Sequence, residues 1–238
     1  FMQTVEEARA LATSMVRTAE GLGIRTLAQI TSMSEPIGTH IGNALEVLGS
    51  ILVLKGEGSP DTRELVVMQG AALLSMAFDE LDMEEGRRKM EKVLTNGEAL
   101  EVFRKMCVQQ GVTHEVAAEL IRYPEKVLGT APEQTTVLAQ QDGFASGYDA
   151  MKMAQLARKH GAGRFALEDE IDPLVGFLLQ APKGEQIKKN QPLFTFYHTR
   201  ELSTEALREL KSMVSISENK PDQMHRLVEL IDSAETKA

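Results

Sequence analysis

The sequence is poor in cysteine and aromatic residues: it contains one cysteine, no tryptophan and 5% aromatic residues in total. A single cysteine cannot form an internal disulfide, and a zinc site built from several cysteines is excluded as well. Long hydrophobic runs are also lacking, since the longest nearly apolar stretch, 66–78, is interrupted by polar residues and is too short to cross a bilayer. The N-terminus shows no basic region followed by an apolar core, so no secretory signal is recognisable. We therefore expect a cytoplasmic protein that does not bind a membrane.

Positive charge is in deficit. The chain has 26 Lys and Arg against 35 Asp and Glu, a net charge of −9 over 238 residues. Such a surface repels phosphate backbones, which argues against nucleic acid as a partner. Hydrophobic residues make up 42% of the chain and charged residues 26%, as in ordinary globular proteins, so wholesale disorder is excluded. The length suits one large domain or two small ones.

The first half of the chain is predicted to be mainly helical. Thr4 and Glu7 have the spacing of a capping box, and apolar residues then recur at helical intervals as far as Gly21. A β-like run follows at 25–33. Further helices are expected at 41–52, at 61–78 with Asp61 as the cap, and at 84–94, 97–110 and 114–121.

The character of the sequence changes near residues 123–132, where we expect a linker. Strand patterns follow at 135–140 and 144–146, and Gln141-Asp142-Gly143 between them predicts a hairpin turn. Further expected elements are a helix at 148–160 closed by Gly161, strands at 173–180 and 193–197, a helix at 201–213 and a partly helical end at 223–238. The predicted fold class is α/β: helices around part of a mixed sheet, then a β-rich α/β C-terminal lobe. The predicted domains are 1–128, a partial central α/β domain, and 133–238.

The most informative segment is 31–47, which has the pattern of a strand, a tight turn and a helix start. Backbone groups at such a turn are free to bind a ligand or an ion. Alternatively, the segment is a plain connection in which Gly38 and Gly42 permit tight packing. The residue types alone favour this second interpretation.

This segment resembles the pyrimidine-nucleoside and thymidine phosphorylase family, whose corresponding stretch reads roughly T-D-M-x-Q-P-L-G-x-x-x-G-N-A-L-E-V. The resemblance continues, in the same order and with the same spacing, at 54–61, 63–66, 94–103, 141–143, 161–164, 171–176 and 188–193. It covers most of the chain and depends on no single short motif.

The resemblance implies phosphorolysis, in which phosphate attacks C1′ of thymidine or uridine and the free base leaves, forming a pentose 1-phosphate. Catalysis of this kind depends on placing phosphate and stabilising charge on the departing base. The resemblance also implies a homodimer with an active site in a cleft between a small helical domain and a large α/β domain.

The family's phosphate-binding and base-binding residues lie upstream of the stretch that matches Phe1-Met2. We therefore assign no catalytic residue within this chain. The first hypothesis is the C-terminal portion of such an enzyme, inactive alone; the second is a non-catalytic interaction or scaffold protein derived from the family, starting at Met2. Because the residues that select the base lie upstream too, thymidine and uridine stay open alternatives.

Two local sites are implied by the resemblance. Phe1 stands where the family places an apolar wall against the pyrimidine. The family's monovalent-cation site uses backbone carbonyls that match Ile37 and His40, together with a Glu that matches Gly49. A hard cation needs several oxygen ligands, so the loss of the charged one favours an empty site. Ser32 stands where the family commonly has Asp. No other cofactor is implied, since phosphate is a co-substrate.

One motif supports a third hypothesis. Ala150-Met151-Lys152-Met153 matches the acceptor motif of biotin carriers, and 183–193 resembles a carrier hairpin. A biotinylated lysine must lie on an exposed turn between two strands, whereas Lys152 is followed by good helix formers. A four-residue match is also a weak signal. The five histidines show no metal-ligand spacing, and Cys107, in a helical run, is expected to be a buried structural thiol.

Overall fold

The computed structural model describes residues 2–222 and 225–232. It confirms the α/β fold class, with helices combined with antiparallel sheets. The chain forms two compact units that are interleaved in sequence. Unit 1 consists of residues 1–33, 64–91 and 224–238, and unit 2 consists of residues 34–63 and 92–223.

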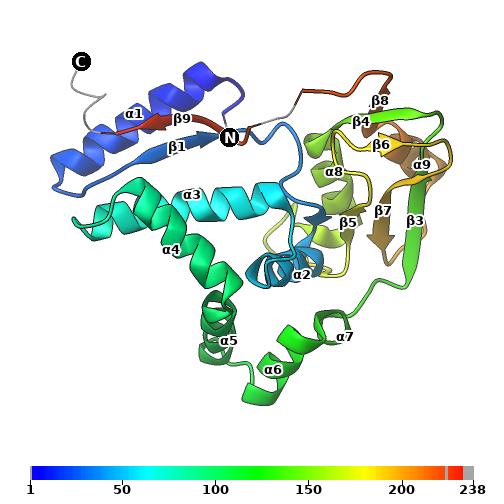
Figure 1. Ribbon diagram of the computed structural model, residues 1–238. Helices are drawn as coiled ribbons and strands as arrows, with labels where there is room; N and C mark the ends of the chain where they lie inside the picture. The colour runs from blue at the N-terminus through cyan, green and yellow to red at the C-terminus, as the bar shows by residue number, and fades with distance from the viewer. Residues whose placement is uncertain (1, 223–224, 233–238) are drawn as a thin grey trace. The chain divides into compact units, whose positions relative to one another are not determined.

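Unit 1 contains helix α1 (Val5–Gly21) and a two-stranded sheet of β1 (Ala28–Thr31) and β9 (Leu227–Ile231) (Figure 1). The strands are antiparallel, with Ala28 opposite Ile231 and Ile30 opposite Glu229. Ile30 and Ile231 pack with Val16 of α1 in one apolar cluster. The helix expected near the C-terminus is wrong for 227–231, because these residues pair with β1 instead.

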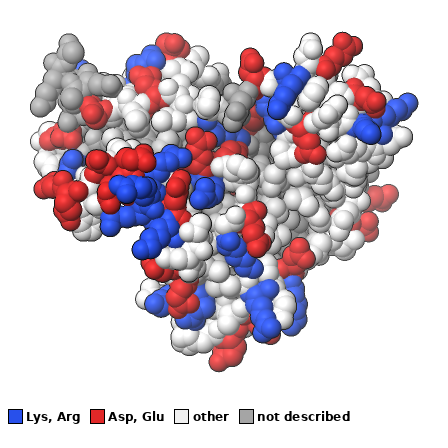
Figure 2. Space-filling model, in the orientation of Figure 1, with Lys and Arg blue, Asp and Glu red and all other residues white. Residues whose placement is uncertain are grey.

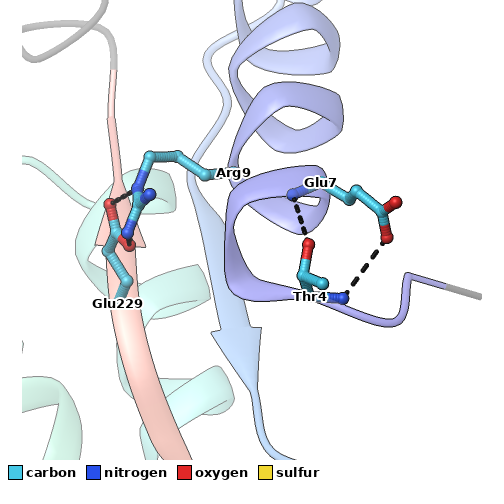
Figure 3. A network of polar contacts seen from close by, with 4 residues as sticks. All are labelled: Thr4, Glu7, Arg9 and Glu229. Atoms are coloured by element: carbon cyan, nitrogen blue, oxygen red, sulfur yellow. Dashed lines mark hydrogen bonds and ion pairs between the residues drawn. The ribbon is translucent and has the colours of Figure 1, made fainter.

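The predicted capping box of α1 is confirmed. The backbone N–H of Glu7 donates to the Thr4 hydroxyl at 3.2 Å, and the Glu7 carboxylate accepts from the backbone N–H of Thr4 at 3.3 Å (Figure 3). One turn later, Arg9 forms a double hydrogen bond with Glu229 of β9, with donor–acceptor distances of 2.8 Å from both Nε and Nη2. The Arg9–Glu229 contact joins the first half of α1 to β9.

Helices α3 (Pro60–Ala77) and α4 (Met83–Thr95) each contribute residues to both units. They pack closely within unit 1, since a Cβ at Gly86 would lie 2.8 Å from the backbone oxygen of Ala71. The glycine is what allows the two helices to approach to this distance.

Unit 2 begins with β2 (His40–Ile41) and α2 (Asn43–Leu54) and continues with three helices after α4: α5 (Glu98–Gln109), α6 (His114–Arg122) and α7 (Pro124–Leu128). Pro124 is the first residue of α7, where proline is favoured because its missing N–H would have no helical partner. The expected linker therefore contains a short helix.

The remainder of unit 2 is β-rich. One sheet has the order β2-β5-β7-β3 and a second has the order β6-β4-β8, and every pairing in them is antiparallel. The strands and helices not yet given are β3 (Glu133–Leu138), β4 (Gly143–Tyr148), α8 (Ala150–Ala157), the π-helical turn η1 (Arg158–Ala162), β5 (Gly176–Leu179), β6 (Gln186–Ile187), β7 (Pro192–His198), α9 (Thr204–Lys211) and β8 (Val214–Ser217).

The predicted hairpin at 141–143 is wrong. Strand β3 pairs with β7, and β4 pairs with β6 and β8, so the two strands flanking this turn belong to different sheets. Asp142 instead accepts a hydrogen bond from the backbone N–H of Lys189 at 2.8 Å. Gly143, at φ 151°, lies so close to β8 that a Cβ would be 2.5 Å from the Ser217 oxygen. The segment thus serves as a corner between two sheets.

Three phenylalanines form the centre of the largest core. Phe177 of β5 and Phe194 and Phe196 of β7 are completely buried, and the ring centroid of Phe177 lies 4.5 Å from that of Phe196. Apolar residues of α8, α9 and the second sheet complete this cluster. Figure 2 shows acidic and basic side chains interspersed over one face of the molecule. In the described residues no helix is long and apolar enough to cross a membrane.

Candidate functional site

The segment singled out in the sequence forms a strand, a turn and a helix start, as predicted. It leads from β1 through the turn of residues 36–42, here called the site turn, into α2. Two glycines bring its end against β5. Gly42 has φ 115°, and a Cβ there would lie 2.5 Å from the carbonyl oxygen of Val175; a Cβ at Gly176 would lie 2.1 Å from the carbonyl oxygen of Ile41. Larger residues at either position would push the two backbones apart.

Asp61 anchors the middle of the site turn. Its Oδ2 accepts from the backbone N–H of Gly38 at 3.1 Å, and its Oδ1 accepts from the Ser59 hydroxyl at 2.5 Å and from the Thr62 N–H at 2.8 Å. Gly38 has φ 72°, which favours glycine. Asp61 was expected to cap α3, but the helix begins at Pro60 and Asp61 lies in its first turn; its contact with the site turn comes from the fold.

The start of α2 is fastened to the segment before β5. The backbone N–H of Ala44 donates to the carbonyl of Pro173 at 2.9 Å, and the side-chain amide of Asn43 donates to the carbonyl of Ala162 at 3.0 Å. The carbonyl of Thr39 accepts from the N–H of Leu179 at 2.8 Å. The Thr39 carbonyl of the site turn is therefore used within the protein.

His40 is half-buried and its ring lies beside Gly49 of α2. A Cβ at Gly49 would be 3.1 Å from His40 Cβ and 3.4 Å from its Nδ1. That Nδ1 lies 3.0 Å from the Thr39 hydroxyl oxygen. Burial lowers the pKa of His40, opposed by the charge of Glu125. Burial thus favours the neutral imidazole.

The cation site that the resemblance implies would combine the backbone carbonyls of Ile37 and His40 with a side chain at position 49. Gly49 has no side-chain oxygen, and the His40 ring occupies the space next to it. The nearby carboxylate of Asp61 already accepts three hydrogen bonds. Among residues 2–222 and 225–232 no group of three or more His, Cys, Asp or Glu could hold a metal ion. A role for the carbonyls of Ile37 and His40 stays a prediction, and Phe1 lies outside the described residues.

Sequence reasoning missed Glu35, which lies just before the site turn. Its side chain is 12% exposed and forms an ion pair with Lys183 at 2.7 Å. Its second oxygen accepts from the backbone N–H of Tyr148 at 3.0 Å. Burial, together with Glu185 and Glu35, raises the pKa of the Tyr148 phenol, whose O–H donates to the carbonyl of Ala181. No short motif could have revealed Glu35, because its partners lie more than a hundred residues away.

The acidic run near residue 170 has structural roles. Asp169 accepts from the backbone N–H groups of Phe165 and Ala166 at 2.8 and 2.9 Å. Asp172 accepts from the Thr199 hydroxyl at 2.6 Å, and its N–H donates to the carbonyl of Gly161 at 2.8 Å. These two carboxylates therefore stabilise turns.

Lys152 does not occupy a carrier-type position. It lies in the first turn of α8, where its backbone N–H donates to Asp149 and its ammonium group pairs with the same residue at 3.2 Å. The segment 183–193 contains β6 and the start of β7, which pair with β4 and with β3 and β5 but not with each other. Neither half of the carrier geometry is therefore present. Cys107 is half-buried in α5.

Comparisons with known proteins match both ends of the chain. Residues 1–100 match the model of the glycosyl transferase family a/b domain, and residues 144–217 match the pyrimidine nucleoside phosphorylase C-terminal domain. Over 230 residues, 96% of the chain, it is 36% identical to the pyrimidine-nucleoside phosphorylase of Bacillus subtilis (strain 168), 34% to that of Staphylococcus haemolyticus (strain JCSC1435) and 32% to that of Staphylococcus aureus (strain USA300). The alignment covers 52% of each relative, so the chain spans about half their length.

Proposed function

Because the chain belongs to the pyrimidine-nucleoside phosphorylase family, we propose that it forms part of an enzyme that cleaves thymidine or uridine with phosphate. In this reaction a phosphate oxygen bonds to C1′ as the bond from C1′ to the base nitrogen breaks. The base leaves with that electron pair and takes up a proton, and the other product is a pentose 1-phosphate. The observation that carries the proposal is the 36% identity along 230 residues, which a shared short motif would not produce.

We further propose that these 238 residues do not catalyse the reaction alone. A glycine-containing loop that could suggest a phosphate cradle, Gly56-Glu57-Gly58, follows the end of α2: Gly56 has φ 79°, and the N–H of Glu57 donates to the carbonyl of Leu52 at 2.9 Å. Its N–H group is therefore used within the protein, and its side chain is acidic. The chemistry is assigned to residues that this chain does not contain.

The proposal includes the predicted division into domains 1–128 and 133–238. The two family models match 1–100 and 144–217, one on each side of that boundary, which supports the division along the sequence, whereas the compact units of the fold are interleaved. A cytoplasmic setting and a homodimer of the whole enzyme are parts of the same proposal.

The test uses the purified chain and a chimera. The chimera joins to this chain the segment of the Bacillus subtilis relative that it does not match. Each protein is incubated with phosphate and either thymidine or uridine, and release of free base is followed by chromatography. We expect no release above the protein-free control for the chain alone and clear release for the chimera, which depends on phosphate.

The full-length Bacillus subtilis protein is the positive control, and circular dichroism checks that the chimera is folded. Turnover by the chain alone that persists through further purification would contradict the assignment of the chemistry to other residues. A folded chimera without phosphorolysis would contradict the proposed function itself.

A further inference from the structure

Glu35 connects three segments that are far apart in the sequence. It belongs to the segment between β1 and the site turn, Tyr148 ends β4, and Lys183 lies in the turn between β5 and β6. The carboxylate contacts the ammonium group of Lys183 at 2.7 Å and accepts from the backbone N–H of Tyr148 at 3.0 Å. All three residues lie in unit 2.

The ion pair is mostly shielded from water. The side chains of Glu35 and Lys183 are 12% and 28% exposed, whereas those of Glu85 and Arg88, a pair along α4, are 42% and 64% exposed. An exposed pair contributes little because water screens its charges. A shielded pair behaves differently, since removing one partner leaves the other charge without compensation in a site that water reaches poorly.

The strand facing Glu35 is adapted to this contact. A Cβ at Gly147 of β4 would lie 3.2 Å from the Glu35 Oε1 atom. The register between β4 and β8 shifts between Ala145 and Gly147. A side chain at position 147 would therefore crowd the carboxylate, and the glycine leaves it room.

The site turn is held along its length by different groups. Asp61 holds Gly38 in the middle, and β5 holds the far end at Gly42. At the near end, one residue before Pro36, the Glu35 carboxylate joins the chain to β4 and to Lys183. Glu35 lies within residues 1–100, which match the glycosyl transferase family a/b domain. Tyr148 and Lys183 lie within residues 144–217, which match the phosphorylase C-terminal domain.

We propose that Glu35 and Lys183 are a positioning pair that holds the site turn against the C-terminal β-rich part of the chain. Neither residue is a catalytic residue, because the pair acts on the orientation of the turn. The inference rests on the proposed function only in treating this turn as part of the enzyme's working site. The test of this inference does not measure phosphorolysis, so the positioning pair and the proposed function can be contradicted independently of each other.

The experiment is amide hydrogen exchange on the complete chain, followed by NMR. The reporters are the N–H groups of Gly38 and Gly42, which donate to Asp61 and Glu46. The amides of β7 report global unfolding. In Lys183→Met and in Glu35→Gln we expect exchange at both reporters to accelerate at least fivefold more than exchange in β7. The double variant should accelerate exchange no more than either single variant, because the second change removes the charge that the first leaves without compensation.

Two variants control the result. Lys183→Arg keeps the positive charge and should restore slow exchange at Gly38 and Gly42. Glu229→Gln breaks the ion pair with Arg9 in unit 1 and should leave both reporters unchanged. The proposal is overturned if, in Lys183→Met and Glu35→Gln, exchange at the reporters accelerates less than fivefold more than exchange in β7. The pair would then contribute only to general stability.

Discussion

His40 is the residue of the site turn whose charge responds to pH. Its imidazole is half-buried beside Gly49, with the Thr39 hydroxyl 3.0 Å from Nδ1. Removing the ring from water disfavours the charged form, so the pKa of His40 in the folded protein lies below its ordinary value of 6.5. The unfolded chain therefore binds a proton at a higher pH than the folded chain does.

This difference has a definite sign. The stabilisation from a neutral His40 is complete above pH 6.5 and is lost as the pH falls below that value through the folded pKa. We expect the free energy of unfolding to fall less between pH 7.5 and pH 5 in His40→Gln than in the natural chain. Urea unfolding at the two pH values measures this. NMR titration of the ring in the native and the urea-unfolded protein gives the two pKa values directly. An equal fall in both proteins would contradict the prediction.

Carboxylates act as backbone anchors in several places. Asp61 holds the N–H of Gly38, Asp169 holds those of Phe165 and Ala166, and Glu35 holds that of Tyr148. A carboxylate that accepts from backbone N–H groups forms a strong, charge-assisted hydrogen bond. Some of the acidic side chains therefore stabilise turns and connections within the fold.

At the scale of elements, helix α1 illustrates a local signal that is decisive. The hydroxyl of Thr4 satisfies the N–H of Glu7, which has no partner within the helix (Figure 3). We expect Thr4→Ala to lower the free energy of unfolding by about 1 kcal/mol, as is usual for an N-cap.

Denaturant unfolding of Thr4→Ala measures the effect, and Thr13→Ala in the middle of α1 is the matched control. Alanine favours the helix interior, so the control should lose no stability. A similar loss in both variants, or in neither, would contradict the capping role of Thr4.

Strand β9 illustrates the opposite case. Residues 227–231 alternate between less exposed and exposed positions, but their sequence, LVELI, does not alternate between apolar and polar residues, and the expected helix there was wrong. Their conformation follows from pairing with β1, about two hundred residues earlier in the chain. Strand propensity depends strongly on such context, so the sequence of a short segment, read without that of its partner strand, says little about its conformation.

At the scale of the whole molecule, unit 1 exposes much apolar surface. On α1 and just after it, Met15 is 62% and Leu22 74% exposed; on α3 and just after it, Leu73 is 65% and Phe78 48% exposed. In the described residues the sheet of this unit has only two strands, and so small a sheet has marginal stability by itself. Apolar groups on this scale favour contact with another surface.

We therefore expect the purified chain to self-associate. Light scattering at tens of micromolar should show species larger than 26.2 kDa, and Met15→Glu together with Leu73→Lys should reduce their share. The matched control is Met151→Lys on α8 of unit 2, where the methionine is 66% exposed, and this change should have no effect. A monodisperse monomer would contradict the prediction.

Several features followed from the sequence alone because their causes are local. The capping box of α1, the strand–turn–helix at 31–47 and the break in helical geometry at Gly161 of η1, with φ 112°, all depend on neighbouring residues and on steric limits of the backbone. The family was also accessible from the sequence, since the order of its motifs is preserved along the chain.

The tertiary structure decided what depends on distant partners. It assigned β3 and β4 to different sheets although the turn between them looked like a hairpin, and it brought Lys183 to Glu35. It also placed the His40 ring beside Gly49, a position at which the sequence indicated only that the family's glutamate is missing. The physical reason is the same in each case: hydrogen bonding, burial and charge pairing at these positions depend on residues that only folding brings together.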